Sequence, residues 1–153
     1  MKNAILFALL ILLTVPLSLF AQSNIHAGNN TCEALVICAF PQLLVGTNIS
    51  QTETQTLINQ ARNDRVIQNN GIVNNRAELA GRVFRALGRT EIALHFGTSQ
   101  PEGAVLVGYI LEMVDASNVK HFVLAGTNRT PLYNPCNTNG SVISAQEVYV
   151  YAR

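Results

Sequence analysis

The hydrophobic pattern divides the chain into a helical first part and a strand-rich second part. One early segment is apolar on nearly all sides, which is typical of a helix at the centre of a domain. A second segment follows Ser50 and carries Glu53 at its third position, which forms a capping box, and a third repeats apolar residues at helical spacing. The three predicted helices are Cys32–Phe40, Gln51–Arg62 and Arg76–Leu87.

After residue 90 the pattern changes to short apolar segments separated by Gly, Pro, Asn and Ser, which indicates strands and turns. The predicted strands are Glu91–Phe96, Ala104–Met113, Lys120–Ala125, Pro131–Tyr133 and Glu147–Ala152. Helices followed by an antiparallel sheet predict an α+β domain. We expect the apolar first helix to occupy its centre and to pack on the sheet.

The first 21 residues have the pattern of a signal peptide rather than of the fold. Lys2 gives a positive start, the following apolar run is short and interrupted by Pro16, and Ala21 suits cleavage before Gln22. The alternative is a retained anchor helix, for which the run is short. The sequence therefore predicts a signal peptide over 1–21 and a single domain over 22–153, secreted or periplasmic.

Charge and spacing exclude several functions. Without Lys2, nine of the ten basic residues remain beside nine acidic ones, so the domain is close to neutral. It lacks a basic stripe, which argues against nucleic acid and, after signal cleavage, against an anionic membrane as partners. The histidines and cysteines lack the spacing of a zinc site, and the glycines form no phosphate loop. We therefore expect no metal and no cofactor; the sequence does not indicate an oligomeric state.

The three cysteines include a candidate nucleophile. Cys32 lies in the first turn of its predicted helix, where the helix dipole lowers the thiol pKa and favours the thiolate. The alternative is a structural disulfide between Cys32 and Cys136. Cys38 cannot pair with Cys32 within one helix, because six residues rise about 9 Å.

A predicted hairpin supplies a candidate base and its orienting partner. If Thr127 and Asn128 are the turn residues, a symmetric register places His121 opposite Asn134, about 5 Å apart at Cβ. An asparagine in that position can hold an imidazole in one tautomer. The alternative is a surface histidine beside a turn asparagine, and a slip of one residue would separate the two side chains.

The order of these features resembles the papain-like cysteine peptidase superfamily. A helix-opening cysteine is followed by "GAVLVGYILEM", "HFVLAG" and "LYNP", as in the staphopains and the double-glycine-leader peptidases. The resemblance spans Thr31 to Arg153 and is one of order and spacing. It implies a papain-like fold with Cys32 as nucleophile, His121 as general acid/base and Asn134 as orienting residue, acting on a peptide or protein substrate.

The sequence also departs from that family. Glu33 follows the cysteine where the family usually has a small residue, and the usual upstream glutamine is missing, which leaves His26, Asn29 or Asn30 as candidate oxyanion donors. The same triad also serves deamidases, transglutaminases and peptidoglycan amidases. Two alternatives to a peptidase stay open: a non-catalytic secreted binding protein with a Cys32–Cys136 disulfide, and a toxin-like effector that modifies protein amides.

Three further titratable residues receive structural interpretations. Glu112 and Asp115 flank a predicted turn, and we expect both carboxylates to be solvated. His95 alternates with Ala93, and we expect it to be a strand histidine rather than a ligand.

Overall fold

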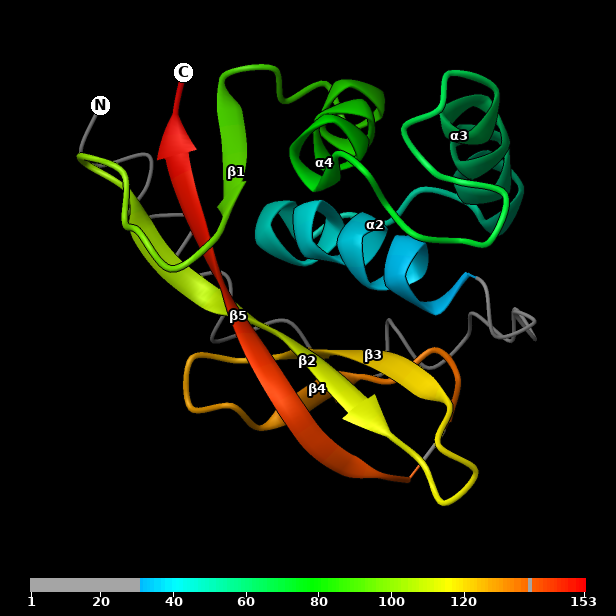
Figure 1. Ribbon diagram of the computed structural model, residues 1–153. Coiled ribbons are helices and arrows are strands. Elements are labelled where there is room, and N and C mark those ends of the chain that lie inside the picture. The colour runs from blue at the N-terminus through cyan, green and yellow to red at the C-terminus, as the bar shows by residue number, and fades with distance from the viewer. Residues whose placement is uncertain (1–30, 138) are drawn as a thin grey trace.

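The computed structural model describes residues 31–137 and 139–153. Three helices pack on a five-stranded antiparallel sheet, as Figure 1 shows, and the predicted α+β class is confirmed. The predicted signal peptide, Gln22 and the candidate oxyanion donors at 26, 29 and 30 lie outside the described residues. The elements are α2 (Cys32–Val45), α3 (Gln51–Asn63), α4 (Arg76–Ala86), β1 (Ile92–Phe96), β2 (Val105–Val114), β3 (Lys120–Ala125), β4 (Pro131–Tyr133) and β5 (Ser141–Ala152).

Helix α2 is the centre of the domain, as its apolar sequence predicts. It runs between the other two helices and the sheet (Figure 1), and every residue from Cys32 to Pro41 is buried. The helix continues through Pro41 and ends at Gly46, whose φ of 70° and N–H bond to the Gln42 carbonyl close the last turn. Because nearly all of α2 is buried, the other helices pack on one side of it and the sheet packs on the other.

The two outer helices begin at side-chain caps. Ser50 Oγ accepts a hydrogen bond from Glu53 N at 3.1 Å, so the predicted N-cap of α3 is confirmed. Asn75 Oδ1 accepts one from Glu78 N at 2.9 Å and starts α4. A tight turn at Gly71 separates the two helices, and Asn75 ends this connecting segment.

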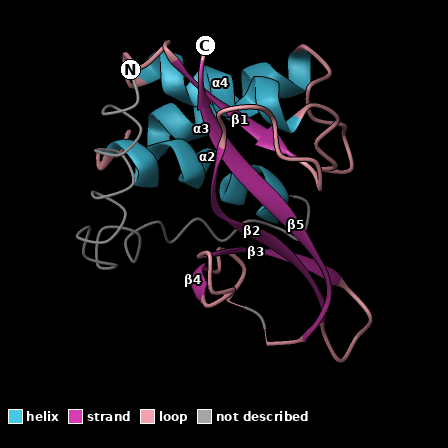
Figure 2. Ribbon diagram, turned by 90° about the vertical axis from the view of Figure 1, so that its left-hand side faces the viewer, coloured by secondary structure: helices cyan, strands magenta, loops and turns pink. Residues whose placement is uncertain are grey.

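The sheet has the strand order β1-β5-β2-β3-β4, with every neighbouring pair antiparallel. Strand β5 lies between β1 and β2 and pairs with both, and it is seen as a long strand in both views (Figures 1 and 2). It begins at Ser141, six residues earlier than predicted, because its first part is exposed and lacks the apolar alternation of a half-buried strand.

The alternation of side chains gives the sheet two apolar faces. Ile110 and Leu124 join the main core with α2, whereas Tyr109 and Val123 belong to a second, smaller cluster. His121 is two residues before Val123 and therefore points to the face of that second cluster. Among the described residues, no helix is both long and apolar enough to cross a membrane.

Candidate functional site

Cys32 is bonded to Cys136 in a disulfide. The bond links the first residue of α2 to the segment after β4, with 6.1 Å between the two Cα atoms and a sequence separation of 104. The sequence offers this disulfide as the alternative to a free Cys32 nucleophile, and the structure contains it. Cys38 has no disulfide partner, and its burial raises its thiol pKa to about 12.

The structure brings His121 next to this disulfide. The two sulfur atoms and a ring nitrogen of His121 all lie within 4.8 Å of one another, and His121 is only 4 % exposed. Both sulfurs are covalently bonded to each other, so neither is a thiolate. A metal ion bound by cysteine requires thiolate ligands, and this oxidised cluster therefore offers no metal site.

The carboxylate beside the histidine belongs to Asp115. His121 Nε2 lies 2.9 Å from Asp115 Oδ2, while Asp115 Oδ1 accepts hydrogen bonds from the backbone N–H groups of Ser117 and Val119. The bond from Val119 and then the contact with His121 lower the pKa of Asp115. Asp115 is thus still partly exposed, but the β2–β3 turn also directs it at the imidazole, which the sequence does not indicate.

The predicted register between β3 and β4 is wrong. A symmetric hairpin would place Ala125 opposite Thr130, but the observed pairs are Leu124 with Tyr133 and Ala125 with Pro131. The physical reason is the loop, which closes between Gly126 and Thr130 with Arg129 in a left-handed conformation (φ 63°).

This shift changes which residue aligns with His121. Asn134 follows the last paired residue of β4, and its carbonyl accepts a hydrogen bond from Asn137 N. The Leu124–Tyr133 register, if continued, would place Cys136 opposite His121. The register therefore accounts for a disulfide, rather than Asn134, beside the imidazole.

Glu33 is a buried anchor. Its Oε2 accepts a hydrogen bond from Val73 N at 3.0 Å, and its Oε1 accepts one from Arg76 Nε at 2.8 Å. The carboxylate that departs from the papain-like pattern thus ties α2 to the segment before α4. The sequence gives no signal for this pair, because Glu33 and Arg76 are 43 positions apart.

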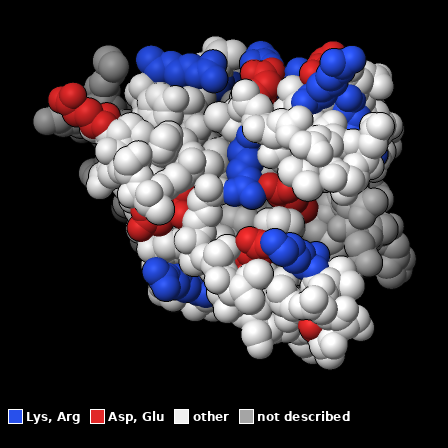
Figure 3. All heavy atoms as spheres, viewed as in Figure 1, with Lys and Arg blue, Asp and Glu red and all other residues white. Residues whose placement is uncertain are grey.

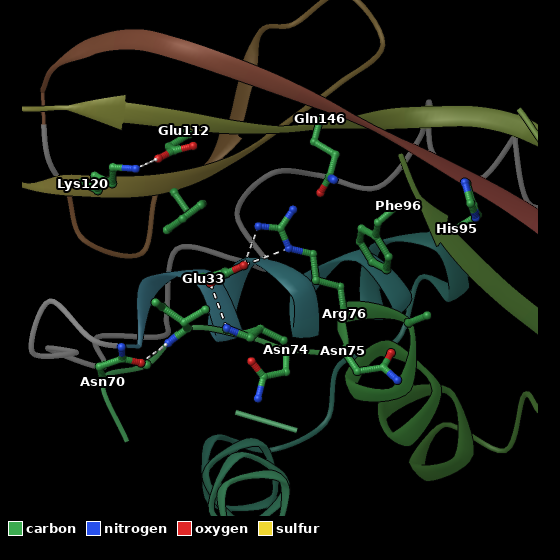
Figure 4. Close-up of a pocket in the computed structure, with 15 residues that line it drawn as sticks. Glu33, Asn70, Asn74, Asn75, Arg76, His95, Phe96, Glu112, Lys120 and Gln146 are labelled. Carbon is green, nitrogen blue, oxygen red and sulfur yellow. Dashed lines mark hydrogen bonds and ion pairs between the residues drawn. The ribbon is translucent and has the colours of Figure 1, made fainter. Parts of the chain in front are cut away.

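A cavity of about 640 Å³ lies beside the disulfide cluster. Figure 3 shows basic and acidic side chains gathered in a hollow between the helical part and the sheet, and Figure 4 shows the residues of this cavity. Glu33 and Lys120 line it, whereas their neighbours Cys32 and His121 do not. The cavity is thus next to the candidate triad but separate from it.

The second expected solvated carboxylate is also paired. Lys120 Nζ lies 2.6 Å from Glu112 Oε1, and Ser144 Oγ donates a hydrogen bond to Glu112 Oε2. The bond from Lys120 is the main cause of a lowered pKa at Glu112. Glu112 is thus still partly exposed, but its side chain also belongs to an ion pair on the cavity wall, which the sequence does not indicate.

Comparisons with protein families, with curated proteins and with solved structures find no match for this chain. Its function is therefore argued from its own residues.

Proposed function

We propose that the protein is a secreted binding protein on a papain-like scaffold, with a structural disulfide where the peptidases carry their catalytic thiol. The single observation that carries this proposal is the bond between Cys32 and Cys136. Disulfides persist in oxidising compartments, which agrees with the secreted or periplasmic location that the sequence predicts.

The state of Cys32 argues against hydrolysis by the oxidised protein. The nucleophile of a cysteine hydrolase is a thiolate, and the Cys32 sulfur, bonded to that of Cys136, is not a thiolate. Cys32 is also only 1 % exposed, and His121 only 4 %. A substrate carbonyl would have to reach both groups at once, so burial and oxidation act in the same direction.

The papain-like part of the proposal rests on chain order and position. Cys32 is the first residue of a buried helix, and His121 is the second residue of a strand that packs against the same helix. The resemblance to papain-like peptidases predicts a cysteine and a histidine at these two positions. A binding protein derived from such a hydrolase would keep this framework, since α2 and the sheet form its core.

A second function has its own support. Reduction of the disulfide would leave a Cys32 thiol within 4.8 Å of His121, which already has a carboxylate partner in Asp115. The Cys32 thiol would transfer its proton to His121, the resulting thiolate would attack an amide carbonyl, His121 would give that proton to the leaving amine, and water would hydrolyse the thioester. In this thiol-dependent hydrolase, Asp115 or the predicted Asn134 would orient the imidazole.

Peptide mapping without reduction decides between the two functions. The native secreted protein is treated with iodoacetamide at pH 6, denatured, digested and analysed by mass spectrometry. We expect one disulfide-linked pair of peptides containing Cys32 and Cys136, and no alkylation of either residue. The same protein after mild reduction is the positive control for labelling.

A free Cys32 would give a different labelling pattern. Alkylation of Cys32 alone in the unreduced protein, faster than that of a free thiol, would contradict the binding-protein proposal and support the hydrolase. Loss of amide hydrolysis in a Cys32→Ala variant would then assign the nucleophile.

A further inference from the structure

Two buried polar atoms direct attention to the cavity. Among the described residues, His95 Nε2 and Gln146 Oε1 are the buried side-chain nitrogen and oxygen atoms that lack a hydrogen-bond partner. Both residues line the same cavity. Buried polar groups are normally paired, so two unpaired atoms on one wall indicate that a ligand supplies the missing partners.

Arg76 adds an available donor to the same space. Its Nε and Nη2 donate to Glu33, whereas Nη1 forms no hydrogen bond within the described part of the chain. Figure 4 shows Gln146 reaching from the sheet towards the guanidinium group of Arg76, which comes from the first residue of α4. The remaining N–H donor of Arg76, Nη1, and the unpaired acceptor Gln146 Oε1 therefore face each other across the cavity.

The charges on the wall restrict the ligand. Two acidic and two basic side chains pair as Glu33 with Arg76 and Glu112 with Lys120, so the lining has no net charge from these four. A dianion such as phosphate would approach two carboxylates, and a simple cation would find both carboxylates already neutralised. A ligand with a single carboxylate carries less charge than a dianion and can accept a hydrogen bond from Arg76 Nη1, and a separate N–H donor suits the unpaired Gln146 Oε1.

The lining also has an apolar part. Phe96 and Phe122 line the cavity from β1 and β3, and Ile72, which is 51 % exposed, lines it from the segment between α3 and α4. Aromatic side chains in a pocket bind apolar groups by burying their surface. The cavity therefore combines a site for a carboxylate and an N–H group with space for an apolar side chain.

We propose that this cavity binds a short peptide of two residues with a free carboxylate and an apolar side chain. Arg76 Nη1 donates to the carboxylate, and Gln146 Oε1 accepts from a peptide N–H. The volume of about 640 Å³ lies within the range of small-molecule sites. This inference rests on the proposed binding function and names its ligand class.

Calorimetric titration of the secreted protein, with its disulfide intact, tests the proposal. The probe is glycyl-phenylalanine, and the matched probe is its C-terminal amide, which lacks the negative charge. We expect the free acid to bind and the amide to bind about tenfold or more weakly, because a charge-assisted hydrogen bond to Arg76 is lost. No binding of the acid, or equal binding of both, would overturn the proposal.

Variants of Gln146 test the acceptor without breaking a bond of the free protein. Gln146→Leu should weaken binding of glycyl-phenylalanine about threefold to tenfold, because one hydrogen bond is lost. Gln146→Glu should abolish it, since the new carboxylate pairs with Arg76 and repels the ligand. Gln55→Leu on exposed α3 is the control, and an equal loss in this control would contradict a local role for Gln146.

The same samples separate this inference from the proposed function. Chromatography of the dipeptide after titration shows whether it stays intact. Hydrolysis of the dipeptide would contradict the proposed non-catalytic function but not the proposed dipeptide site. An absence of binding together with a mapped Cys32–Cys136 bond would contradict the dipeptide site alone.

Discussion

Cys38 shows how burial controls the chemistry of a single residue. It lies in the middle of α2, is 1 % exposed and is not part of the disulfide. Burial disfavours the charged thiolate and raises the pKa of Cys38 from 9.0 to about 12. In contrast to a helix-opening cysteine, this thiol is therefore protonated and unreactive at neutral pH.

The raised pKa of Cys38 predicts a pH-dependent stability. Above pH 9 the unfolded chain releases this proton and the folded protein keeps it, so the free energy of unfolding falls as pH rises towards 12; below pH 9 the contribution is constant. Between pH 9 and 10 we expect wild type to lose about 1 kcal/mol more than Cys38→Ala. Urea unfolding of both proteins measures this, and parallel pH curves would contradict it.

One neighbour of His121 could be predicted from the sequence, and the other could not. Cys32 could be predicted because a helix-opening cysteine has a recognisable chemistry, and the structure places it near His121. Asp115 could not be predicted as a partner, because its position depends on the conformation of the β2–β3 turn. A symmetric hairpin predicts Asn134 opposite His121. The observed loop, with Arg129 in a left-handed conformation, gives a different register.

At the scale of elements, apolar periodicity predicted the helices well and the longest strand only in part. The predicted bounds of α3 and α4 differ from the observed bounds by one residue at one end. The first half of β5 is held by pairing with β2 while its side chains stay exposed. Such a segment carries no apolar signal, so only the neighbouring strand determines it.

Two glycines in different elements should respond oppositely to alanine. At Gly108 in β2, an added Cβ would lie 2.4 Å from the Ala125 carbonyl oxygen and 3.2 Å from Phe40 Cε1. We expect Gly108→Ala to destabilise the protein by about 1–3 kcal/mol, because strand β3 and helix α2 would have to move. Urea unfolding measures the change, and an unaltered midpoint would contradict this close packing.

Gly81 in α4 is the matched control for that substitution. Its added Cβ would lie 3.5 Å from the flexible Arg153 side chain, which is an ordinary contact. Alanine in a helix interior restricts the unfolded chain, so Gly81→Ala should stabilise the protein by about 0.5–1 kcal/mol. Destabilisation by Gly81→Ala as well would contradict the ordinary contacts described at Gly81, while leaving the close packing at Gly108 in place.

At the scale of the molecule, the disulfide and the cavity join the same two parts. Cys32 belongs to the helical part and Cys136 to the strand-rich part, while the cavity is lined from both. Glu33, one residue after Cys32, holds Arg76 at the cavity wall. The covalent bond therefore supports the element from which the proposed ligand site is built.

Removal of the disulfide should lower the stability of the whole domain. The bond closes a loop across 104 positions, and a loop of this length restricts the unfolded chain strongly. We expect the double variant Cys32→Ser/Cys136→Ser to lose about 2–5 kcal/mol in the free energy of unfolding. Reduction of the Cys38→Ala protein should lower its free energy of unfolding by a similar amount. This variant is used because it has no third thiol that could exchange with the disulfide. Equal urea midpoints for oxidised and reduced protein would show that Cys32 and Cys136 are not bonded in solution, and the reduced, thiol-dependent hydrolase would then be the better account of this site.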